Sequence, residues 1–385
     1  MTLAATVAPD VAVVRELGAD ELGSWDAAAV DAPGGHVLQS RAWAEHRRER
    51  GWQARFLAVG EGRVLALSRA WPLVGGGSAY VPRGPAGLAA ETAAVAAGAL
   101  LAVADHLAAL GIDVITADAE IPSAESAYRA AIAARGFRPI EEIQPSRHRM
   151  SLTLPEGTDE AAVLSGVAKS TRQRIRHAEK DGTVVVRHDR RPDRGAAEGV
   201  VDAAVTGADE ALDRFYRLLR LTGDRRGFGF AGPDEFVRWW RRALDAGHLV
   251  LLEARDGSAG GEVLGALLLY RHGGRLSTQH SGDLAERRRD RPGTMHLLRW
   301  RAIQLALAEG RDEMDLGGVD VAGARRPPRP GEAMYGLYEH KRGFGAEWLE
   351  LTGAQELVVR PWRYAAGRVV GRAVRLAPAR FAPAR

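Results

Sequence analysis

One pattern constrains the fold more than any other, because it occurs twice. In the second half of the chain, residues 295–309 form a long amphipathic run that leads through Gly310 to the short segment Met314-Asp315-Leu316, which Gly317 ends. In the first half, the alanine- and leucine-rich residues 91–110 lead through Gly111 into a similar segment. A helical period, a glycine and then a short segment ended by another break are typical of a helix followed by a strand. The sequence therefore predicts one helix–strand–helix unit in two copies.

A second repeated pattern indicates the fold class. Residues 56–67 and residues 251–269 both read as two strands joined by a glycine turn. Strands that pair locally and then alternate with helices predict mixed α/β sheets. This order matches the GNAT acyltransferase fold, present twice. We therefore predict two tandem GNAT-like domains with mixed, largely antiparallel central sheets.

The predicted boundary lies where Pro155-Glu156-Gly157 ends an alternating strand. We place the first domain at residues 1–155, the second at residues 156–356 and a basic C-terminal tail at residues 357–385. The tail contains seven arginines and no acidic residue. Such a segment could bind RNA, or it could lie on an anionic membrane surface.

Composition excludes several kinds of chemistry. The chain has no cysteine, which rules out disulfides, zinc sites built on thiolates and cysteine nucleophiles. Its eleven histidines show no metal-ligand spacing, so no metal site is expected. No segment reaches about 18 uninterrupted apolar residues, which a membrane-spanning helix would need. A cytoplasmic protein is the simplest expectation.

Basic side chains are clustered although the formal net charge is only +4. Residues 158–181 predict a single helix, and the spacing of Lys169, Arg172, Arg176 and Lys180 puts these four on one stripe. A further cluster, Arg287, Arg288 and Arg289, falls in a predicted loop. These clusters are either ordinary solvated surface or a site for a polyanion.

The loop that binds acetyl-CoA in GNAT enzymes is missing from both halves. That loop has the form [RQ]-x-x-G-x-[GA], and its backbone N–H groups bind a pyrophosphate. Neither residues 81–87 nor residues 286–293 fit it. The fold would then use another acyl donor, and the arginines favour one rich in phosphate.

Five segments carry a resemblance to a known family: residues 38–43, 80–85, 169–182, 315–318 and 338–345. In their order and spacing the sequence resembles the Fem family over nearly the whole chain. Fem proteins are non-ribosomal peptidyltransferases that move an amino acid from aminoacyl-tRNA onto the stem peptide of a peptidoglycan precursor. The resemblance is to compact members, because the long helical arm of some members is absent.

The resemblance assigns roles to residues of this chain. It implies Lys341 and Asp118 as catalytic residues, with Lys341 stabilising negative charge and Asp118 acting either as a base or as a structural or binding carboxylate. The implied substrate-binding residues are Arg47, Trp43, Arg83, Gly84 and Tyr338. The expected tRNA-binding residues are Lys169, Arg172, Arg176, Lys180, Arg287, Arg288 and Arg289.

Lys341 also has a simpler interpretation. It falls in the last turn of a predicted helix, where a solvated lysine offsets the helix dipole by a few tenths of a kcal/mol. In that interpretation Gly343 ends the helix with a positive φ.

The expected function is aminoacyl transfer from aminoacyl-tRNA, as co-substrate, to a lipid-linked or UDP-linked muropeptide precursor. No cofactor and no DNA partner are expected, and peripheral contact with the inner membrane surface is compatible with the tail. Two other classes stay open. One is a GNAT-fold acyltransferase acting on a small molecule or natural-product intermediate, and the other is a non-catalytic module for RNA or anionic lipid.

Overall fold

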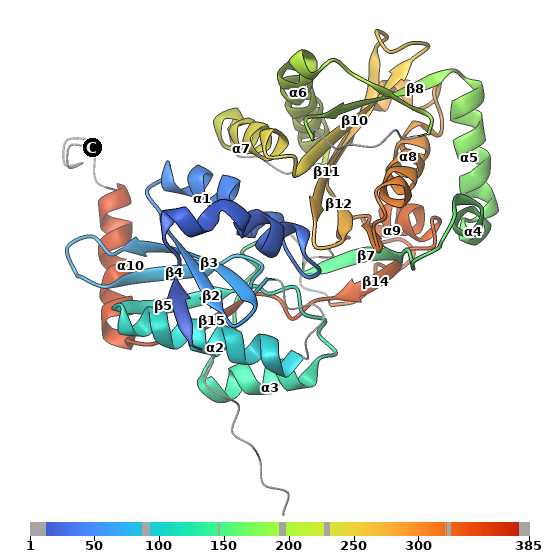
Figure 1. Cartoon of the computed structure of the whole chain (residues 1–385). Helices are drawn as coiled ribbons and strands as arrows, with labels where there is room; N and C mark the ends of the chain where they lie inside the picture. The colour runs from blue at the N-terminus through green and yellow to red at the C-terminus, as the bar shows by residue number, and fades with distance from the viewer. Residues whose placement is uncertain are drawn as a thin grey trace, which may run out of the picture. The chain divides into compact units, whose positions relative to one another are not determined.

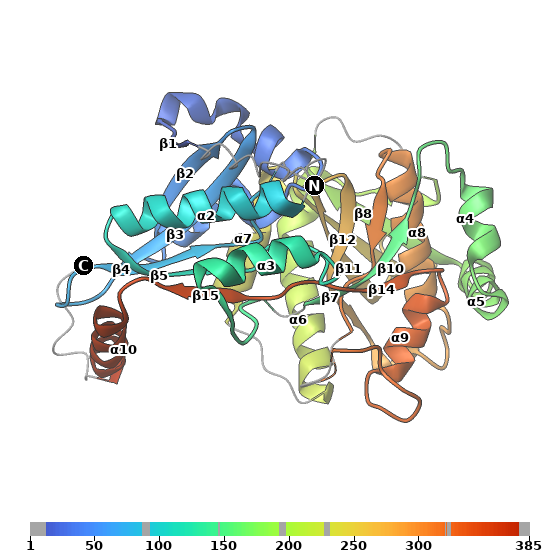
Figure 2. The same cartoon turned by 90° about the horizontal axis from the view of Figure 1, so that it is seen from below.

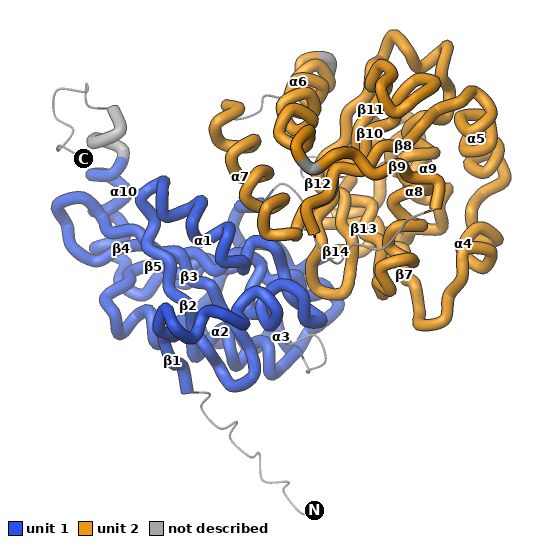
Figure 3. The backbone as a smooth tube through the Cα atoms, turned by 45° about the horizontal axis from the view of Figure 1, so that its top comes forward, with its two compact units in different colours: residues 1–145, 351–385 blue, residues 146–350 orange. Residues whose placement is uncertain are grey.

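The structure, a computed structural model, describes residues 13–86, 93–144, 147–191, 198–226, 232–319, 321 and 325–376. It divides into two compact units (Figure 3). Unit 1 comprises residues 1–145 and 351–385, and unit 2 comprises residues 146–350. The first division falls ten residues before the predicted boundary, and the C-terminal residues belong to unit 1. No helix among the described residues is long and apolar enough to cross a bilayer.

The C-terminal segment that we expected to be a separate basic tail is partly built into unit 1. Strand β15 (Gln355–Val358) pairs with two strands of that unit, and helix α10 (Pro361–Leu376) follows it. The Arg363 guanidinium pairs with the buried carboxylate of Asp113 at 2.6 Å. Residues 377–385 of the expected tail lie outside the described part of the chain.

Unit 1 contains a seven-stranded sheet that is antiparallel except for one parallel pair, β4 and β5. In spatial order, the strands are β1 (Val14–Glu16), β2 (Gln53–Val59), β3 (Gly62–Ala70), β4 (Gly77–Val81), β5 (Ile112–Ala117), β15 and β6 (Arg138–Pro139). Helices α2 (Ala93–Ala109) and α3 (Ser126–Arg135) lie side by side on this sheet (Figure 2). Helix α1 (Arg41–Arg48) packs on β2 and β3 through a separate hydrophobic cluster, which includes Trp25, Ala44 and Phe56.

Unit 2 contains an eight-stranded sheet, again mostly antiparallel. In spatial order, the strands are β14 (Glu347–Glu350), β7 (His148–Thr153), β13 (Glu313–Asp315), β12 (Arg275–Asp283), β11 (Val263–His272), β10 (Leu249–Asp256), β8 (Thr183–Asp189) and β9 (Val200–Asp202). The pairs β12–β13 and β8–β9 are parallel. Both predicted mixed, largely antiparallel sheets are therefore present.

Six helices accompany this sheet in the described part of unit 2: α4 (Glu160–Gly166), α5 (Lys169–Lys180), α6 (Ala208–Arg226), α7 (Pro233–Asp245), α8 (Thr294–Ala308) and α9 (Tyr335–Arg342). Helix α8 packs on β10 to β13, and α5 packs against α8 (Figure 1). The predicted single helix over residues 158–181 is wrong. It breaks after Gly166 because Val167 and Ala168 are extended.

The predicted repeat corresponds to α2–β5–α3 in unit 1 and α8–β13–α9 in unit 2. Each sheet also takes a strand from a distant part of the sequence. Strand β7, which directly follows unit 1 in the chain, inserts between β13 and β14 of unit 2. Strand β15, which follows unit 2, inserts between β5 and β6 of unit 1.

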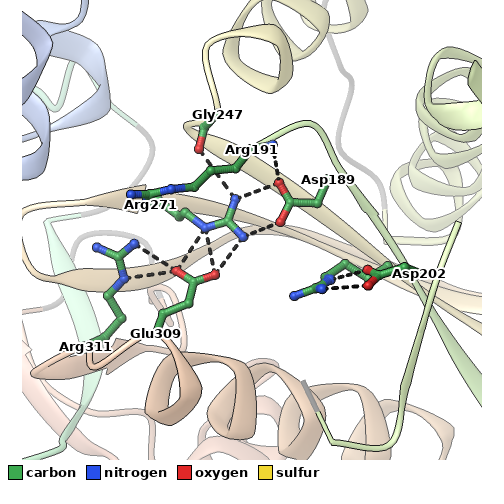
Figure 4. A network of polar contacts seen from close by, with 8 residues as sticks. Asp189, Arg191, Asp202, Gly247, Arg271, Glu309 and Arg311 are labelled. Atoms are coloured by element: carbon green, nitrogen blue, oxygen red, sulfur yellow. Dashed lines mark hydrogen bonds and ion pairs between the residues drawn. The ribbon is translucent and has the colours of Figure 1, made fainter. Parts of the chain in front are cut away.

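A buried ionic network holds one end of unit 2 together (Figure 4). The fully buried guanidinium of Arg271 on β11 lies 2.6 Å from the Asp189 carboxylate on β8 and 2.7 Å from the Glu309 carboxylate after α8. Arg311 adds a second cation to Glu309 at 2.8 Å. Because both carboxylates contact the Arg271 guanidinium, its pKa is raised despite burial. The network therefore ties two strands to the end of α8.

Candidate functional site

Lys341 is buried, not solvated. It lies in the last turn of α9 with 3% of its surface exposed. Its Nζ donates hydrogen bonds to the carbonyl oxygens of Gly317 at 2.8 Å and Gly318 at 2.7 Å. Gly317 takes a positive φ of 80°, which lets the chain turn around the ammonium group directly after β13. This loop fixes the position of the cation, so solvation at a helix end does not describe Lys341.

The predicted cap at Gly343 is also wrong. Gly343 has a φ of −59°, and the positive φ of 87° occurs at Gly345. A Cβ atom on Gly343 would lie 2.5 Å from Oγ1 of Thr171 on α5. Close approach of α5 therefore explains this glycine, and α5 packs against the turn that carries Lys341.

Asp315 supports the same loop, although the sequence did not indicate it as a site residue. Its Oδ1 accepts a hydrogen bond from the backbone N–H of Gly317 at 2.7 Å. Burial raises the pKa of Asp315 to about 6, and the charge of Glu313 acts in the same direction. Arg149 and Arg275 oppose that shift. A carboxyl group that titrates near neutral pH therefore lies at the base of the loop that holds Lys341.

A pocket of about 390 Å³ lies beside α9 and is lined mainly by α8, α9 and the segment between β12 and α8. Three of its lining residues contact one another: Nε of Arg299 donates to Nε2 of His340 at 2.8 Å, and Nδ1 of His340 lies 3.1 Å from Nε2 of His296. Burial lowers the pKa of Arg299 to about 10. Burial and the charges of Arg174 and Arg299 lower the pKa of His296 to about 4.

The sequence analysis did not find this group. One signal was available, since Arg299 lies between Leu298 and Trp300 in a helix that is otherwise mostly apolar. A charged residue within a buried helical run requires a partner. That partner, His340, is 41 residues away in the sequence.

Asp118 lies in unit 1 with only 1% of its surface exposed. Its two carboxylate oxygens accept hydrogen bonds from the hydroxyl of Tyr80 at 2.8 Å and from the backbone N–H of Arg83 at 2.7 Å. The Nε atom of Arg83 lies 3.7 Å from the same carboxylate. Burial raises the pKa of Asp118, while these partners oppose that shift. The carboxylate thus holds the turn that contains Arg83, which has a positive φ of 52°.

Position 84 in this turn has no space for a side chain, which explains the glycine there. A Cβ atom there would be 2.8 Å from Nε2 of Gln39. That amide donates to the carbonyl oxygen of Pro82 at 2.5 Å, while Oε1 of Gln39 accepts from the N–H of Leu65 at 2.6 Å. Asp118, Arg83 and Gly84 therefore belong to one rigid corner of unit 1.

Arg47 and Trp43 contact each other on α1. The Arg47 guanidinium lies 5.3 Å from the centre of the Trp43 ring and 5.1 Å from that of Trp52, so the two indoles hold it. Arg69 lies 5.0 Å from the Trp52 ring. Tyr338 is in unit 2, where it packs on the core one turn before Lys341 and stacks with Arg342 at 5.9 Å.

The expected tRNA-binding residues fall into two different environments. Lys169, Arg176 and Lys180 are exposed on α5, while Arg172 donates to the backbone oxygens of Leu164 and Val167. In the loop before α8, Arg287 pairs with Asp256 and Arg288 pairs with Asp283. Arg289 is exposed. The stripe on α5 is thus largely solvent-facing, whereas two of the loop arginines are held by carboxylates.

Comparisons with known proteins agree with this architecture. A model of the family "Acetyltransferase (GNAT) domain" matches residues 165–342. A lipid II:glycine glycyltransferase of Staphylococcus aureus is 28% identical over 220 residues, which cover 53% of this chain and 46% of that protein. The chain thus spans about half the length of the curated relatives it matches.

One solved structure is similar over nearly the full length. The crystal structure of FemX aligns with a TM-score of 0.71 at 19% sequence identity, covering 92% of this chain and 99% of that one. The shared fold confirms the prediction of tandem GNAT-type units. The chain is thus similar to these glycyltransferases in sequence and to FemX in fold.

Proposed function

We propose that the protein is an aminoacyltransferase that moves an amino acid onto an amine of the stem peptide of a peptidoglycan precursor. The observation that carries the proposal is the buried ammonium group of Lys341, which the Gly317 and Gly318 carbonyls hold within the GNAT-type region. The similarity to lipid II:glycine glycyltransferases supports the reaction class.

The chemistry of acyl transfer gives Lys341 a role. When an amine attacks an ester carbonyl, negative charge builds on the carbonyl oxygen and then on the leaving oxygen. A cation fixed before the reaction starts stabilises such charge without reorganisation. Two carbonyl hydrogen bonds hold Lys341 in this way. The contacts of Asp118 support a structural role, because its oxygens already accept from Tyr80 and Arg83.

The acyl donor in this proposal is aminoacyl-tRNA, and no further cofactor is needed. The basic groups of unit 2 support a donor that carries phosphates. The acceptor is a lipid-linked precursor, in line with the relatives' name. Both substrates place the protein in the cytoplasm at the inner face of the membrane.

One surface of unit 1 supports peripheral membrane contact. On α10, the side chains of Trp362 and Val369 are 70% and 68% exposed. Arg368, which directly precedes Val369, is exposed as well. Exposed Trp with neighbouring cations is typical of helices that lie in a membrane interface.

The direct test is a transfer assay. The purified protein is incubated with pools of charged tRNA and with either lipid-linked or UDP-linked precursor, and the precursor is analysed by mass spectrometry. We expect a mass increase of one amino-acid residue on the lipid-linked form. Transfer from acetyl-CoA, or no product with any charged tRNA, would contradict the proposal.

A further inference from the structure

Two segments that are far apart in the sequence meet at one edge of unit 1. They are the loop of residues 71–76, which joins β3 to β4, and helix α10 (Figure 1). The centre of the Trp71 ring lies 6.3 Å from that of Tyr364 on α10. A Cβ atom at Gly367 would overlap the Trp71 ring, so this glycine allows the close approach. The loop therefore packs directly on the helix.

Asp113 holds both segments. Its buried carboxylate accepts hydrogen bonds from Nε1 of Trp71 and from the backbone N–H of Gly77, both at 3.1 Å. The same carboxylate pairs with the Arg363 guanidinium in the first turn of α10 at 2.6 Å. One buried charge thus fixes both ends of the loop and the beginning of the helix, so that the two segments form one surface.

This surface exposes apolar side chains from both segments. Leu73 in the loop is 96% exposed, and the neighbouring Pro72 is exposed as well. On α10, Trp362 and Val369 are 70% and 68% exposed. Leu73 also has a positive φ of 63°, a conformation that is uncommon for residues other than glycine. A leucine at this position is thus favoured neither by burial nor by backbone conformation.

Helix α10 carries apolar residues on the face that points away from the sheet. Its inner face contacts Trp71 and Asp113. Trp362, Ala365 and Val369 are exposed and recur at intervals of three and four residues, so they share the outer face. A surface helix normally has polar side chains on its outer face. The apolar outer face of α10 is instead typical of an interaction site.

The charge of both segments is basic. Residues 62–90 and residues 357–385 contain no acidic residue, and the second stretch contains seven arginines. Arg69 near the end of β3 and Arg368 on α10 are exposed. Exposed apolar side chains beside cations match a bilayer interface that has anionic headgroups. RNA would match the arginines but would leave Leu73 without an apolar environment.

We propose that the loop of residues 71–76 inserts into the headgroup region of an anionic bilayer, with Leu73 as its inserting side chain, while the outer face of α10 lies in the same interface. A single helix would leave unit 1 free to rotate about the helix axis, and the second contact removes that freedom. The inference rests on the proposed function for its biological reason, since a lipid-linked precursor presents its stem peptide at a membrane surface.

The chain has no cysteine, so one introduced thiol can be labelled at a single position. Leu73→Cys is labelled with nitrobenzoxadiazole and mixed with vesicles of phosphatidylglycerol and phosphatidylcholine. The control is Val95→Cys on α2, which is 44% exposed and lies about 20 Å along that helix from the contact of Ala108 with Arg360. We expect a blue shift and quenching by spin-labelled lipid at position 73 only. A label at position 73 that stays in water while the protein sediments with the vesicles would overturn the proposal.

A second variant removes the side chain without straining the fold. Leu73→Gly accepts the positive φ of this position, so its Tm should equal or exceed that of the wild type. We expect it to bind anionic vesicles about tenfold more weakly, the effect of withdrawing one leucine from the interface. Val95→Ala should bind as the wild type does. Equal sedimentation of Leu73→Gly and wild type, or equal binding of the wild type to vesicles of phosphatidylcholine alone, would contradict the insertion into an anionic bilayer.

Transfer assays separate this surface from the proposed function. Leu73→Gly should keep wild-type transfer to lipid-linked precursor dissolved in detergent and transfer more slowly to the same precursor in vesicles. Vesicle binding that depends on Leu73 in a protein that transfers no amino acid would support the surface and reject the proposed function. Equal transfer by Leu73→Gly and wild type in vesicles would reject the surface and leave the function intact. Displacement of the protein from vesicles by tRNA would assign the surface to nucleic acid instead.

Discussion

The Nζ atom of Lys341 lies 2.8 Å from the carbonyl oxygen of Gly317. This hydrogen bond joins the end of helix α9 to the loop that follows strand β13. The two elements are 24 residues apart in the sequence. The contact turns a lysine with an ordinary position at a helix end into a fixed cation. Removing the Lys341 side chain should therefore have two separable effects, one on the rate of acyl transfer and one on the stability of the loop.

Replacing Lys341 with methionine should lower turnover by roughly 10²- to 10³-fold, the usual loss for one oxyanion-stabilising donor. The two carbonyl groups lose a partner, so we also expect a stability loss of about 1–3 kcal/mol. Steady-state kinetics and urea unfolding of the same sample separate these effects. A folded variant with wild-type kcat would show that Lys341 is structural.

Arg47→Ala should weaken binding of the phosphate-bearing precursor about tenfold, because the Trp43 and Trp52 rings hold this guanidinium in one position. Isothermal titration calorimetry with UDP-linked precursor measures it. The neighbouring Arg48→Ala is the control, since Arg48 is paired with Glu45. Equal affinities of the two variants would remove Arg47 from the binding site.

Arg271→Met should destabilise unit 2 by about 3–5 kcal/mol, because Asp189 and Glu309 would lose their shared buried cation. Arg311→Met should cost less, since Arg311 contacts only one of these carboxylates. Urea denaturation curves of both variants provide the comparison. An equal cost for the two would show that the network does not depend on Arg271.

Because of Asp315, the free energy of unfolding should fall as pH rises. Its pKa of about 6 in the folded protein exceeds the value of about 3.9 for an unfolded aspartate, so the folded state binds the extra proton between these values. The extra proton adds about 2–3 kcal/mol to the free energy of unfolding below pH 4, and this stabilisation is lost by about pH 6.5. Asp315→Asn should therefore gain stability relative to wild type between pH 4 and pH 6.5. A pH-independent difference between the two proteins in urea unfolding would contradict this.

Replacing Trp362 and Val369 together with serine should reduce binding to anionic vesicles several-fold, because both apolar side chains are exposed on α10. Sedimentation with vesicles containing phosphatidylglycerol measures the loss, and affinity for charged tRNA is the control. Unchanged sedimentation would place the membrane contact elsewhere. Truncation after Gln355 is a poor alternative, because it would also remove most of β15 from the sheet of unit 1.

The sequence predicted the paired sheets and the repeat because glycines and hydrophobic periods are local signals. It could not predict the break between α4 and α5, since residues 158–181 have helical spacing throughout and only the extended Val167 and Ala168 interrupt them. The reason for a glycine at position 343 is not local either. Its function depends on Thr171, which only the fold brings near.

The candidate site residues also divide into those with a local sequence signal and those that only the fold brings together. The sequence indicates Lys341 and Asp118 because they lie in segments that match a known family, but it does not indicate that both side chains are buried. Arg299, His340 and His296 come from two helices, and their contacts depend on how α8 and α9 pack. Such a group has no local sequence pattern.

The exchange of β7 and β15 has a consequence for any attempt to divide this protein. A fragment ending at residue 155 would keep β7 but lack β15, and the remaining fragment would keep β15 but lack β7. Each fragment would have an open gap in its sheet and a surplus strand with unpaired backbone groups. The two should aggregate when expressed alone and regain activity when expressed together, as a split enzyme in which each piece supplies the strand that the other lacks.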